Sequence, residues 1–200
     1  SIHEFAKNNK LEDLENIISN IDIVFHFAGI NKTTEKINFE KVNVALTKEI
    51  CRIVSKNPKT KLFFASSIQA TEYNNYGKSK KKAEQICLSL NKHFNNEVYI
   101  LRLPGVFGGG SKPNYNSVVA TFCFNTANKI KLNIIDPEKE INLLFIEDLC
   151  SQLNDLMNKR FLSNFIKLKN IYKISIGVLA STIKSFQNKD FNIKILDSKD

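Results

Sequence analysis

Three apolar runs, each closing in small or polar residues, constrain the fold of this chain most strongly. They are Ile21-Asp-Ile-Val-Phe-His-Phe-Ala-Gly29, Lys61-Leu-Phe-Phe-Ala-Ser-Ser67 and Val98-Tyr-Ile-Leu-Arg-Leu-Pro-Gly-Val-Phe-Gly108. Between the first two, apolar residues recur at helical spacing. Alternating strands and helices predict an α/β fold, a doubly wound parallel sheet with right-handed crossovers. Ligands bind such open sheets at the carboxyl ends of the strands.

The same patterns place the individual elements. Strands are expected over 22–27, 62–65, 98–103, 141–145 and 169–174. Helices are expected over 11–19, 39–53, 76–90, 117–129, 147–158 and 178–186. The Pro- and Gly-rich stretch after residue 103 is expected to be a loop.

A serine, a tyrosine and a lysine follow the second apolar run. Ser67 ends the run, and Tyr76 and Lys80 are four residues apart at the start of the next helix, so they lie on one helix face. A free tyrosine titrates near pH ~10, and a nearby ammonium favours its phenolate. We therefore expect Lys80 to lower the pKa of Tyr76, and Ser67 to hold a reacting carbonyl or alcohol oxygen against the phenol. This set suits proton transfer while a hydride moves.

The tyrosine–lysine pair has a second interpretation. The chain is rich in lysine, so such a pair also arises by chance on the solvated face of an amphipathic helix. The three strand ends favour the catalytic interpretation because they gather these residues at one sheet edge.

The chain resembles the extended short-chain dehydrogenase/reductase family, which acts on nucleotide sugars, and within it the reductase domain of capsular polysaccharide enzymes that make the UDP-N-acetyl-L-fucosamine precursor. The resemblance extends from about Leu11 to about Phe186. It is carried by these segments: His26-Phe-Ala-Gly-Ile-Asn31, Ala65-Ser-Ser-Ile-Gln-Ala70, Asn75-Tyr-Gly-Lys-Ser-Lys80, Arg102-Leu-Pro104 and Lys112-Pro-Asn-Tyr-Asn-Ser-Val-Val-Ala-Thr-Phe-Cys123.

The resemblance implies a Rossmann-like fold, an NADP(H) or NAD(H) cofactor and a role for each matching residue. Ser67, Tyr76 and Lys80 are the implied catalytic residues. The implied cofactor-binding residues are Phe27, Ala28, Gly29, Tyr76, Lys80, Pro104, Gly105 and Val106. Asn43 matches a helix asparagine that supports the lysine directly or through water, although a solvent-facing asparagine fits the pattern nearly as well. Gly105 departs from the family, which usually has asparagine there.

The implied substrate is a UDP-sugar. Its candidate ligands are Gln69, Lys112, Asn114, Tyr115 and Asn116, whose amide, phenol and ammonium groups suit hydroxyls and phosphates. The segment 112–116 is also compatible with an ordinary surface turn before a helix. Dehydratases of the superfamily place an Asp-Glu pair after the active-site hydroxyl. Here Ile68-Gln69 stands there instead, which favours reduction of a 4-keto group, or 4-epimerisation, over dehydration.

The glycine-rich phosphate turn of the family's first βαβ unit does not occur in the sequence. We therefore expect a chain that lacks roughly 30 N-terminal residues, with the strand over 22–27 at an exposed apolar edge. Residues 1–110 are expected to form the partial dinucleotide-binding portion. Residues 111–200 are expected to form a small C-terminal substrate-binding portion, interleaved with the last sheet elements in one structural domain. Whether a C-terminal cupin domain belongs to the protein stays open, and a truncated, non-catalytic remnant is an alternative function.

Composition bounds the other partners. The net charge of +9 in 200 residues comes from lysines spread along the chain without interleaved aromatic residues, so we expect no nucleic-acid partner. No run is long and apolar enough for a membrane span, and no signal peptide is visible. Scattered Cys51, Cys87, Cys123 and Cys150 predict reduced core thiols, no metal site and a cytoplasmic protein. The family resemblance implies a homodimer in the full-length protein.

Overall fold

The first sheet is built around β2 (Lys61–Ser67), whose residues after Lys61 are all buried. The computed structural model describes residues 1–6, 8–32 and 39–186. In it β2 pairs in parallel with β1 (Ile23–His26) on one side and with β3 (Val98–Leu103) on the other. A strand buried on both faces reads as a continuous apolar run, which is why the sequence identifies β2 clearly. β1 lies at the edge of this sheet, as expected.

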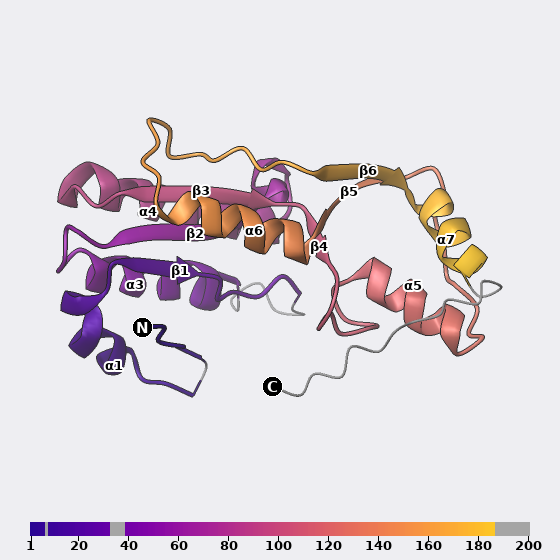
Figure 1. Ribbon diagram of the computed structural model, residues 1–200, viewed down its shortest axis with the longest axis horizontal. Helices are drawn as coiled ribbons and strands as arrows, with labels where there is room; N and C mark the ends of the chain where they lie inside the picture. Colours follow the sequence, from indigo (N-terminus) through magenta and orange to yellow (C-terminus); the bar gives the residue numbers. More distant parts are fainter. Residues whose placement is uncertain (7, 33–38, 187–200) are drawn as a thin grey trace. The chain divides into compact units, whose positions relative to one another are not determined.

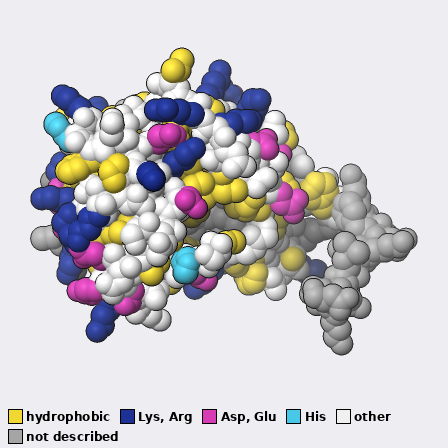
Figure 2. Space-filling model, turned by 60° about the vertical axis from the view of Figure 1, so that its left-hand side comes forward, with side chains coloured by type: hydrophobic (Ala, Val, Ile, Leu, Met, Phe, Trp, Pro, Cys, Tyr) yellow, Lys and Arg dark blue, Asp and Glu magenta, His cyan; other side chains and the backbone are white. Residues whose placement is uncertain are grey.

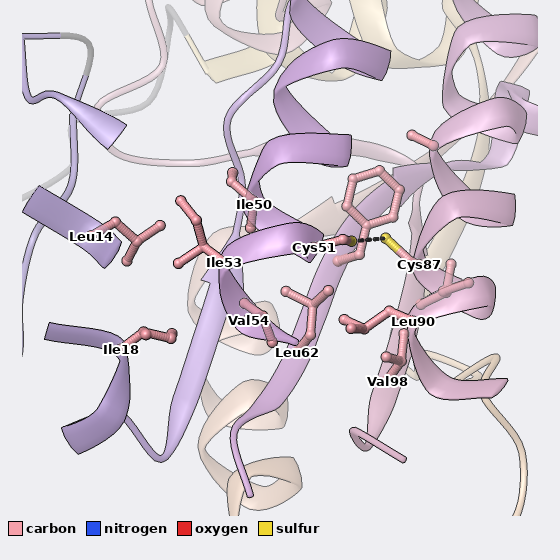
Figure 3. Close-up of a cluster of buried hydrophobic side chains, with 13 residues drawn as sticks. Leu14, Ile18, Ile50, Cys51, Ile53, Val54, Leu62, Cys87, Leu90 and Val98 are labelled. Atoms are coloured by element: carbon pink, nitrogen blue, oxygen red, sulfur yellow. Dashed lines mark hydrogen bonds between the residues drawn. The ribbon is translucent and has the colours of Figure 1, made fainter. Parts of the chain in front are cut away.

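Helices cover both faces of this sheet (Figure 1). Because side chains alternate along a strand, Leu62 and Phe64 of β2 point to one face and Phe63 to the other. The first face packs on α3 (Leu46–Val54) and α4 (Asn75–Phe94), as Figure 3 shows. The second packs on α6 (Ile146–Met157). This arrangement confirms the expected α/β sheet with helices on both faces.

The remaining elements lie close to their expected positions. They are α1 (Leu11–Ile17), the 3-10 turns η1 (Ile18–Asn20) and η3 (Ile68–Thr71), the π-helix η2 (Glu40–Ala45), β4 (Gly105–Phe107), α5 (Val118–Ala127), β5 (Glu140–Phe145), β6 (Ile171–Ser175) and α7 (Ile176–Ser185). Two differ from the prediction. The stretch expected to be a loop after residue 103 contains β4, and the helix expected over 39–53 starts as a π-helix.

The chain forms two compact units. Within the described residues, the first comprises Ser1–Val106 with Leu144–Ile171, and the second comprises Phe107–Leu143 with residues 172–186. The core of the second unit is a smaller cluster around Phe122 and Leu179, drawn mainly from α5 and α7. A second sheet has the order β4-β5-β6. The predicted division at residue 110 into a dinucleotide-binding and a substrate-binding portion stays a prediction.

The cysteines divide into two kinds. Cys51 and Cys87 are buried with their sulfur atoms 3.9 Å apart (Figure 3), but Cys123 and Cys150 are exposed. The prediction of four core thiols is therefore wrong for the latter two, because α5 and α6 turn these positions away from the apolar clusters. No helix in the described residues is long and apolar enough to span a membrane. On the face shown in Figure 2, Lys and Arg side chains are scattered among acidic and apolar ones.

Candidate active site

Ser67 lies at the carboxyl end of β2, where the strand passes into η3. Its backbone is still extended, and its hydroxyl accepts a hydrogen bond from the Gln69 amide at 3.2 Å. The side chain is buried at this strand end. The start of η3 therefore fixes where the Ser67 hydroxyl lies.

The first turn of α4 is pressed against η3. Asn74 caps the helix by accepting a hydrogen bond from the Gly77 amide at 2.7 Å. A Cβ added at Gly77 would lie only 2.0 Å from the carbonyl oxygen of Gln69. Glycine is needed at this position because the helix approaches the turn more closely than any side chain permits. The close approach places Tyr76 beside Ser67.

Burial has the larger effect on the pKa of the Tyr76 phenol and raises it, and the neighbouring Ser67 side chain has a smaller effect that lowers it. The net result is a Tyr76 pKa above its usual value. The phenol ring also packs on Phe39, with 5.9 Å between ring centroids. The expectation that Lys80 lowers the pKa of Tyr76 is therefore wrong for this structure, and the Tyr76 phenol is neutral at physiological pH.

Lys80 is buried one turn further along α4. Its ammonium donates a hydrogen bond to the Ala65 carbonyl at 2.7 Å and lies 4.9 Å from the centre of the Phe64 ring. Burial lowers the pKa of Lys80 to about 8, against the opposing effects of Cys87 and Glu84. The ammonium is thus directed at β2 instead of at the Tyr76 oxygen, which explains the missing effect on the phenol.

The turn after β1 lies against Lys80. A Cβ built on Gly29 would meet the Lys80 ammonium nitrogen at 3.4 Å and the Asn43 side-chain oxygen at 3.0 Å. Phe27, Ala28 and Gly29 are exposed, and the Phe27 ring stacks on Phe25 with 5.7 Å between centroids. The turn therefore offers accessible backbone and an aromatic face next to a buried ammonium.

Asn43 fastens this turn to α4. Its side-chain oxygen accepts a hydrogen bond from the Ile30 amide at 2.8 Å, and its side-chain nitrogen donates to the Ile30 carbonyl at 2.8 Å and to the Ser79 hydroxyl at 3.0 Å. Asn43 is buried within the π-helix η2. In the described part of the chain Asn43 makes no direct hydrogen bond to Lys80, so the direct form of the predicted support is wrong, while support through water stays a prediction. The solvent-facing alternative is wrong, because Asn43 is buried and holds the turn in place.

The other predicted site residues lie in different places. Pro104 is buried just after β3, while Gly105 and Val106 belong to β4. Gln69 is exposed in η3, with its side-chain oxygen 3.4 Å from the Asn74 amide nitrogen. The predicted substrate ligands of the second unit, all exposed in the loop before α5, are Lys112, Asn114, Tyr115 and Asn116. Their predicted role stays a prediction.

The part of the chain that contains Ser67, Tyr76 and Lys80 is similar to a known protein family. Residues 4–160 match the model of the NAD dependent epimerase/dehydratase family. The chain belongs to this family. The match covers all of these residues and ends within the first unit.

Named relatives of the family agree with this assignment. The chain is 38% identical over 187 residues to the UDP-2-acetamido-2,6-beta-L-arabino-hexul-4-ose reductase of Pseudomonas aeruginosa, covering 92% of this chain and 50% of the relative. The capsular polysaccharide assembling protein CapF from Staphylococcus aureus is 30% identical with a TM-score of 0.75, over 88% of this chain and 47% of CapF. The chain thus spans about half the length of these relatives.

A more distant family structure shows the fold alone. The UDP-glucuronic acid 4-epimerase from Bacillus cereus, solved with UDP-glucuronic acid and NAD, is 18% identical with a TM-score of 0.80, over 90% of this chain and 65% of the epimerase. The chain therefore has the Rossmann-like α/β fold of this family.

Two groups of buried polar residues behind the family's site were not found from the sequence. In the first, Glu84 joins Ser66 and Arg102. In the second, His26 and Thr47 lie 2.8 Å apart through His26 Nε2 and Thr47 Oγ1. Glu84 had a usable signal, because it follows Lys80 by four residues and so lies on the same helix face. His26 had none, since a histidine at the end of an apolar run does not reveal its partner.

Proposed function

We propose that this chain forms the catalytic part of an NAD(P)H-dependent reductase that acts on the 4-keto group of a UDP-2-acetamido-2,6-dideoxy-hexulose in capsule or O-antigen nucleotide-sugar synthesis. The observation that carries the proposal is the close approach of η3 to the first turn of α4, which brings Ser67 and Tyr76 together at the end of β2, with the Lys80 ammonium buried one helical turn further along. The 38% identity to a UDP-sugar 4-keto reductase supports the substrate class.

The residues around Lys80 fit a nicotinamide dinucleotide. The missing side chain of Gly29 lets the turn after β1 pack directly against Asn43 and the Lys80 ammonium, and the exposed Phe27 ring and the backbone of Ala28 form an accessible surface beside them. Lys80 donates one of its three hydrogens to Ala65 and retains two for ribose hydroxyls. Pro104, Gly105 and Val106 are the proposed neighbours of the nicotinamide. When bound, the reduced cofactor supplies a hydride.

The chain's own residues manage the oxygen of the substrate. Ser67 donates a hydrogen bond that polarises the 4-keto oxygen, and the neutral Tyr76 phenol gives that oxygen its proton as the carbon accepts the hydride. The alcohol is thereby formed, with the phenolate reprotonated from solvent. Gln69, with Lys112, Asn114, Tyr115 and Asn116, is the proposed set of UDP-sugar ligands.

A reductase assay tests the proposal. The UDP-linked 4-keto sugar is mixed with NADPH or NADH and with this chain, or with a version extended upstream in its coding sequence, and loss of reduced cofactor is followed by absorbance. We expect turnover that falls by about 10²–10⁴-fold in Tyr76→Phe, because the proton donor is lost. Cofactor consumption unaffected by Tyr76→Phe would contradict the proposal.

The assay also separates the reductase from a 4-epimerase of the same family and from a non-catalytic remnant. An epimerase interconverts UDP-sugars without added cofactor, and a remnant neither binds dinucleotide nor turns over. Isothermal titration of both versions of the chain with NADPH and NADH identifies a non-catalytic remnant, because a remnant binds neither dinucleotide.

Two further properties belong to the proposal. The buried, unpaired thiols of Cys51 and Cys87 suit a reducing compartment, which supports a cytoplasmic enzyme. A homodimer of the full-length protein is proposed from the family resemblance, and light scattering on the extended chain measures it. The proposal includes no nucleic-acid partner.

A further inference from the structure

A buried ion pair lies directly behind the candidate active site. The Glu84 carboxylate is 2% exposed and accepts two hydrogen bonds from Arg102, at 2.9 Å from Nε and 2.7 Å from Nη2. It accepts a third from the Ser66 hydroxyl at 2.5 Å. The Arg102 guanidinium also lies 4.7 Å from the centre of the Phe165 ring. Both carboxylate oxygens are thus occupied, and the geometry is that of a bidentate pair.

Ser66, Glu84 and Arg102 each lie within four positions of a candidate site residue in the sequence. Ser66 precedes Ser67 at the end of β2, and Arg102 stands two residues before Pro104 at the end of β3. Glu84 itself lies on α4, one turn beyond Lys80 and two turns beyond Tyr76. The three elements that carry the site therefore meet at one carboxylate.

We propose that Glu84 is a positioning residue of the site, which fastens the ends of β2 and β3 to α4 so that Ser67 meets Tyr76, and which places a carboxylate one helical turn from the buried Lys80 ammonium. This inference rests on the proposed roles of Ser67, Tyr76 and Lys80. The effects of Glu84 on the titration of Lys80 and on the position of Ser67 can both be measured without enzymatic turnover.

Among the buried titratable groups described near Lys80, Glu84 is the one that carries a negative charge. The titratable and charged groups on the elements packed near Lys80 are His26 on β1, Cys51 on α3, Tyr76, Glu84 and Cys87 on α4, Arg102 on β3, and the exposed Glu40–Lys82 pair between η2 and α4. A hydrogen bond with Cys51, together with burial, holds the pKa of Cys87 well above its usual value, so Cys87 is a neutral thiol near neutral pH. Burial keeps His26 neutral as well.

The Arg102 side chain is 34% exposed, whereas the Glu84 side chain is 3% exposed. Taking the Glu84 charge out of water offsets much of the attraction between the two groups, so the pair adds little to stability. A pair of well-packed apolar side chains would stabilise the fold equally well. What an apolar pair does not provide is a negative charge next to a lysine that burial would otherwise deprotonate. That difference makes the charge of Glu84 testable separately from its packing.

The test measures the titration of Lys80 in Glu84→Gln. The chain is labelled with lysine carrying ¹³C at Cε, the Lys80 signal is assigned with Lys80→Met, and its chemical shift is followed against pH. In the unmodified chain the midpoint is expected at about 8. In Glu84→Gln we expect it to fall by roughly one pH unit, because the charge that favours the ammonium is gone while the shape is kept.

A matched control removes a charge that Lys80 does not face. Glu40→Gln breaks the exposed pair with Lys82 beside the same helix, and we expect the Lys80 midpoint to stay unchanged. If Glu84→Gln does not fold, judged by circular dichroism, the double variant Glu84→Gln with Arg102→Met removes both charges and leaves no unpaired guanidinium. It is expected to lower the Lys80 midpoint as well. An unchanged midpoint in the folded variant overturns the proposed charge role.

Ser66→Ala tests the positional role. It keeps the Glu84 charge but cuts the bond to β2, so the Lys80 midpoint is expected to stay near 8. The Tyr76 phenol, observed through ¹³Cζ-labelled tyrosine and assigned with Tyr76→Phe, is expected to titrate at higher pH because Ser67, whose side chain lowers the Tyr76 pKa, is held less firmly beside it. An unchanged Tyr76 midpoint overturns the positional role. Neither readout involves cofactor or sugar, so an inactive chain would refute the proposed function and leave this result standing.

Discussion

His26 is a buried imidazole with one satisfied nitrogen. The Thr47 hydroxyl donates to the Asn43 carbonyl at 2.7 Å, so His26 Nε2 carries the hydrogen and donates to Thr47. His26 Nδ1 has no hydrogen-bond partner among the described residues. Burial, with a smaller effect from Lys80, lowers the pKa of His26 to about 3.

This residue predicts acid sensitivity. The folded chain keeps His26 neutral, while the unfolded chain takes up a proton near pH 6.5, so acid favours the unfolded state. From about pH 7 to about pH 5 the free energy of unfolding is expected to fall by about 2 kcal/mol through this group. Urea unfolding at both pH values measures the effect. His26→Gln is expected to remove that part of the loss and the exposed His93→Gln to retain it, and equal losses in the two variants would contradict the assignment.

Asn43 is the second residue on which the local geometry depends. In Asn43→Ala three hydrogen bonds are lost, two of them to the Ile30 backbone, and we expect a destabilisation of about 1–3 kcal/mol. The Ile30 amide should also exchange faster with deuterium, because its acceptor is removed. The exposed Asn154→Ala on α6 is the control, expected within about 0.5 kcal/mol of the unmodified chain. Unchanged protection of Ile30 would show that the turn is held by something else.

At the scale of elements, the contact between η3 and α4 depends on Gly77. Gly77→Ala introduces a Cβ 2.0 Å from a backbone oxygen that has no freedom to rotate away. We expect a loss of about 1–3 kcal/mol from overpacking, which exceeds the roughly 1 kcal/mol that alanine returns through helix propensity. Thermal unfolding measures this loss, and a raised Tyr76 midpoint reports separation from Ser67.

Gly109→Ala is the matched control for this element contact. Its added Cβ meets nothing within 4 Å, so the substitution is expected to leave both stability and the Tyr76 titration unchanged. A Gly77→Ala chain as stable as this control would mean that η3 and α4 are not tightly packed.

The elements also show which features a sequence can reveal. The apolar runs of β1, β2 and β3, and the tyrosine–lysine spacing on α4, are local patterns, and they predicted the sheet and the meeting of Ser67 with Tyr76. The direction of the Lys80 ammonium was not predictable, because it depends on the Ala65 carbonyl across the helix–sheet packing. The Glu84–Arg102 pair joins residues 18 positions apart, and β4 is only three residues long. Neither leaves a periodic pattern in the sequence.

At the scale of the whole molecule, the two units differ in how completely their cores are buried. Among the described residues of the first unit, ten apolar side chains have 0% exposure, namely Ile53, Val54, Leu62, Phe63, Ala83, Cys87, Val98, Ile100, Leu101 and Leu144. The buried residues of the second unit, such as Phe122 and Leu179, remain 3–8% exposed. Water thus reaches the second core more readily, and its local opening costs less free energy.

Hydrogen exchange followed by mass spectrometry measures this difference. Amides in α5 and α7 are expected to exchange roughly tenfold or more faster than those in β2, β3 and the middle of α4, corresponding to at least about 1.4 kcal/mol in opening free energy. Equal protection in both units would indicate a single cooperative core.

The division of the cysteines has a practical consequence for following these openings. Cys123 and Cys150 are at the surface, and Cys51 and Cys87 face each other between α3 and α4. A small thiol reagent should therefore modify the first pair within the mixing time. It should modify the second pair only as fast as those two helices separate. The rate at which Cys51 and Cys87 are modified therefore measures how fast this core opens, and no cysteine needs to be introduced for the measurement.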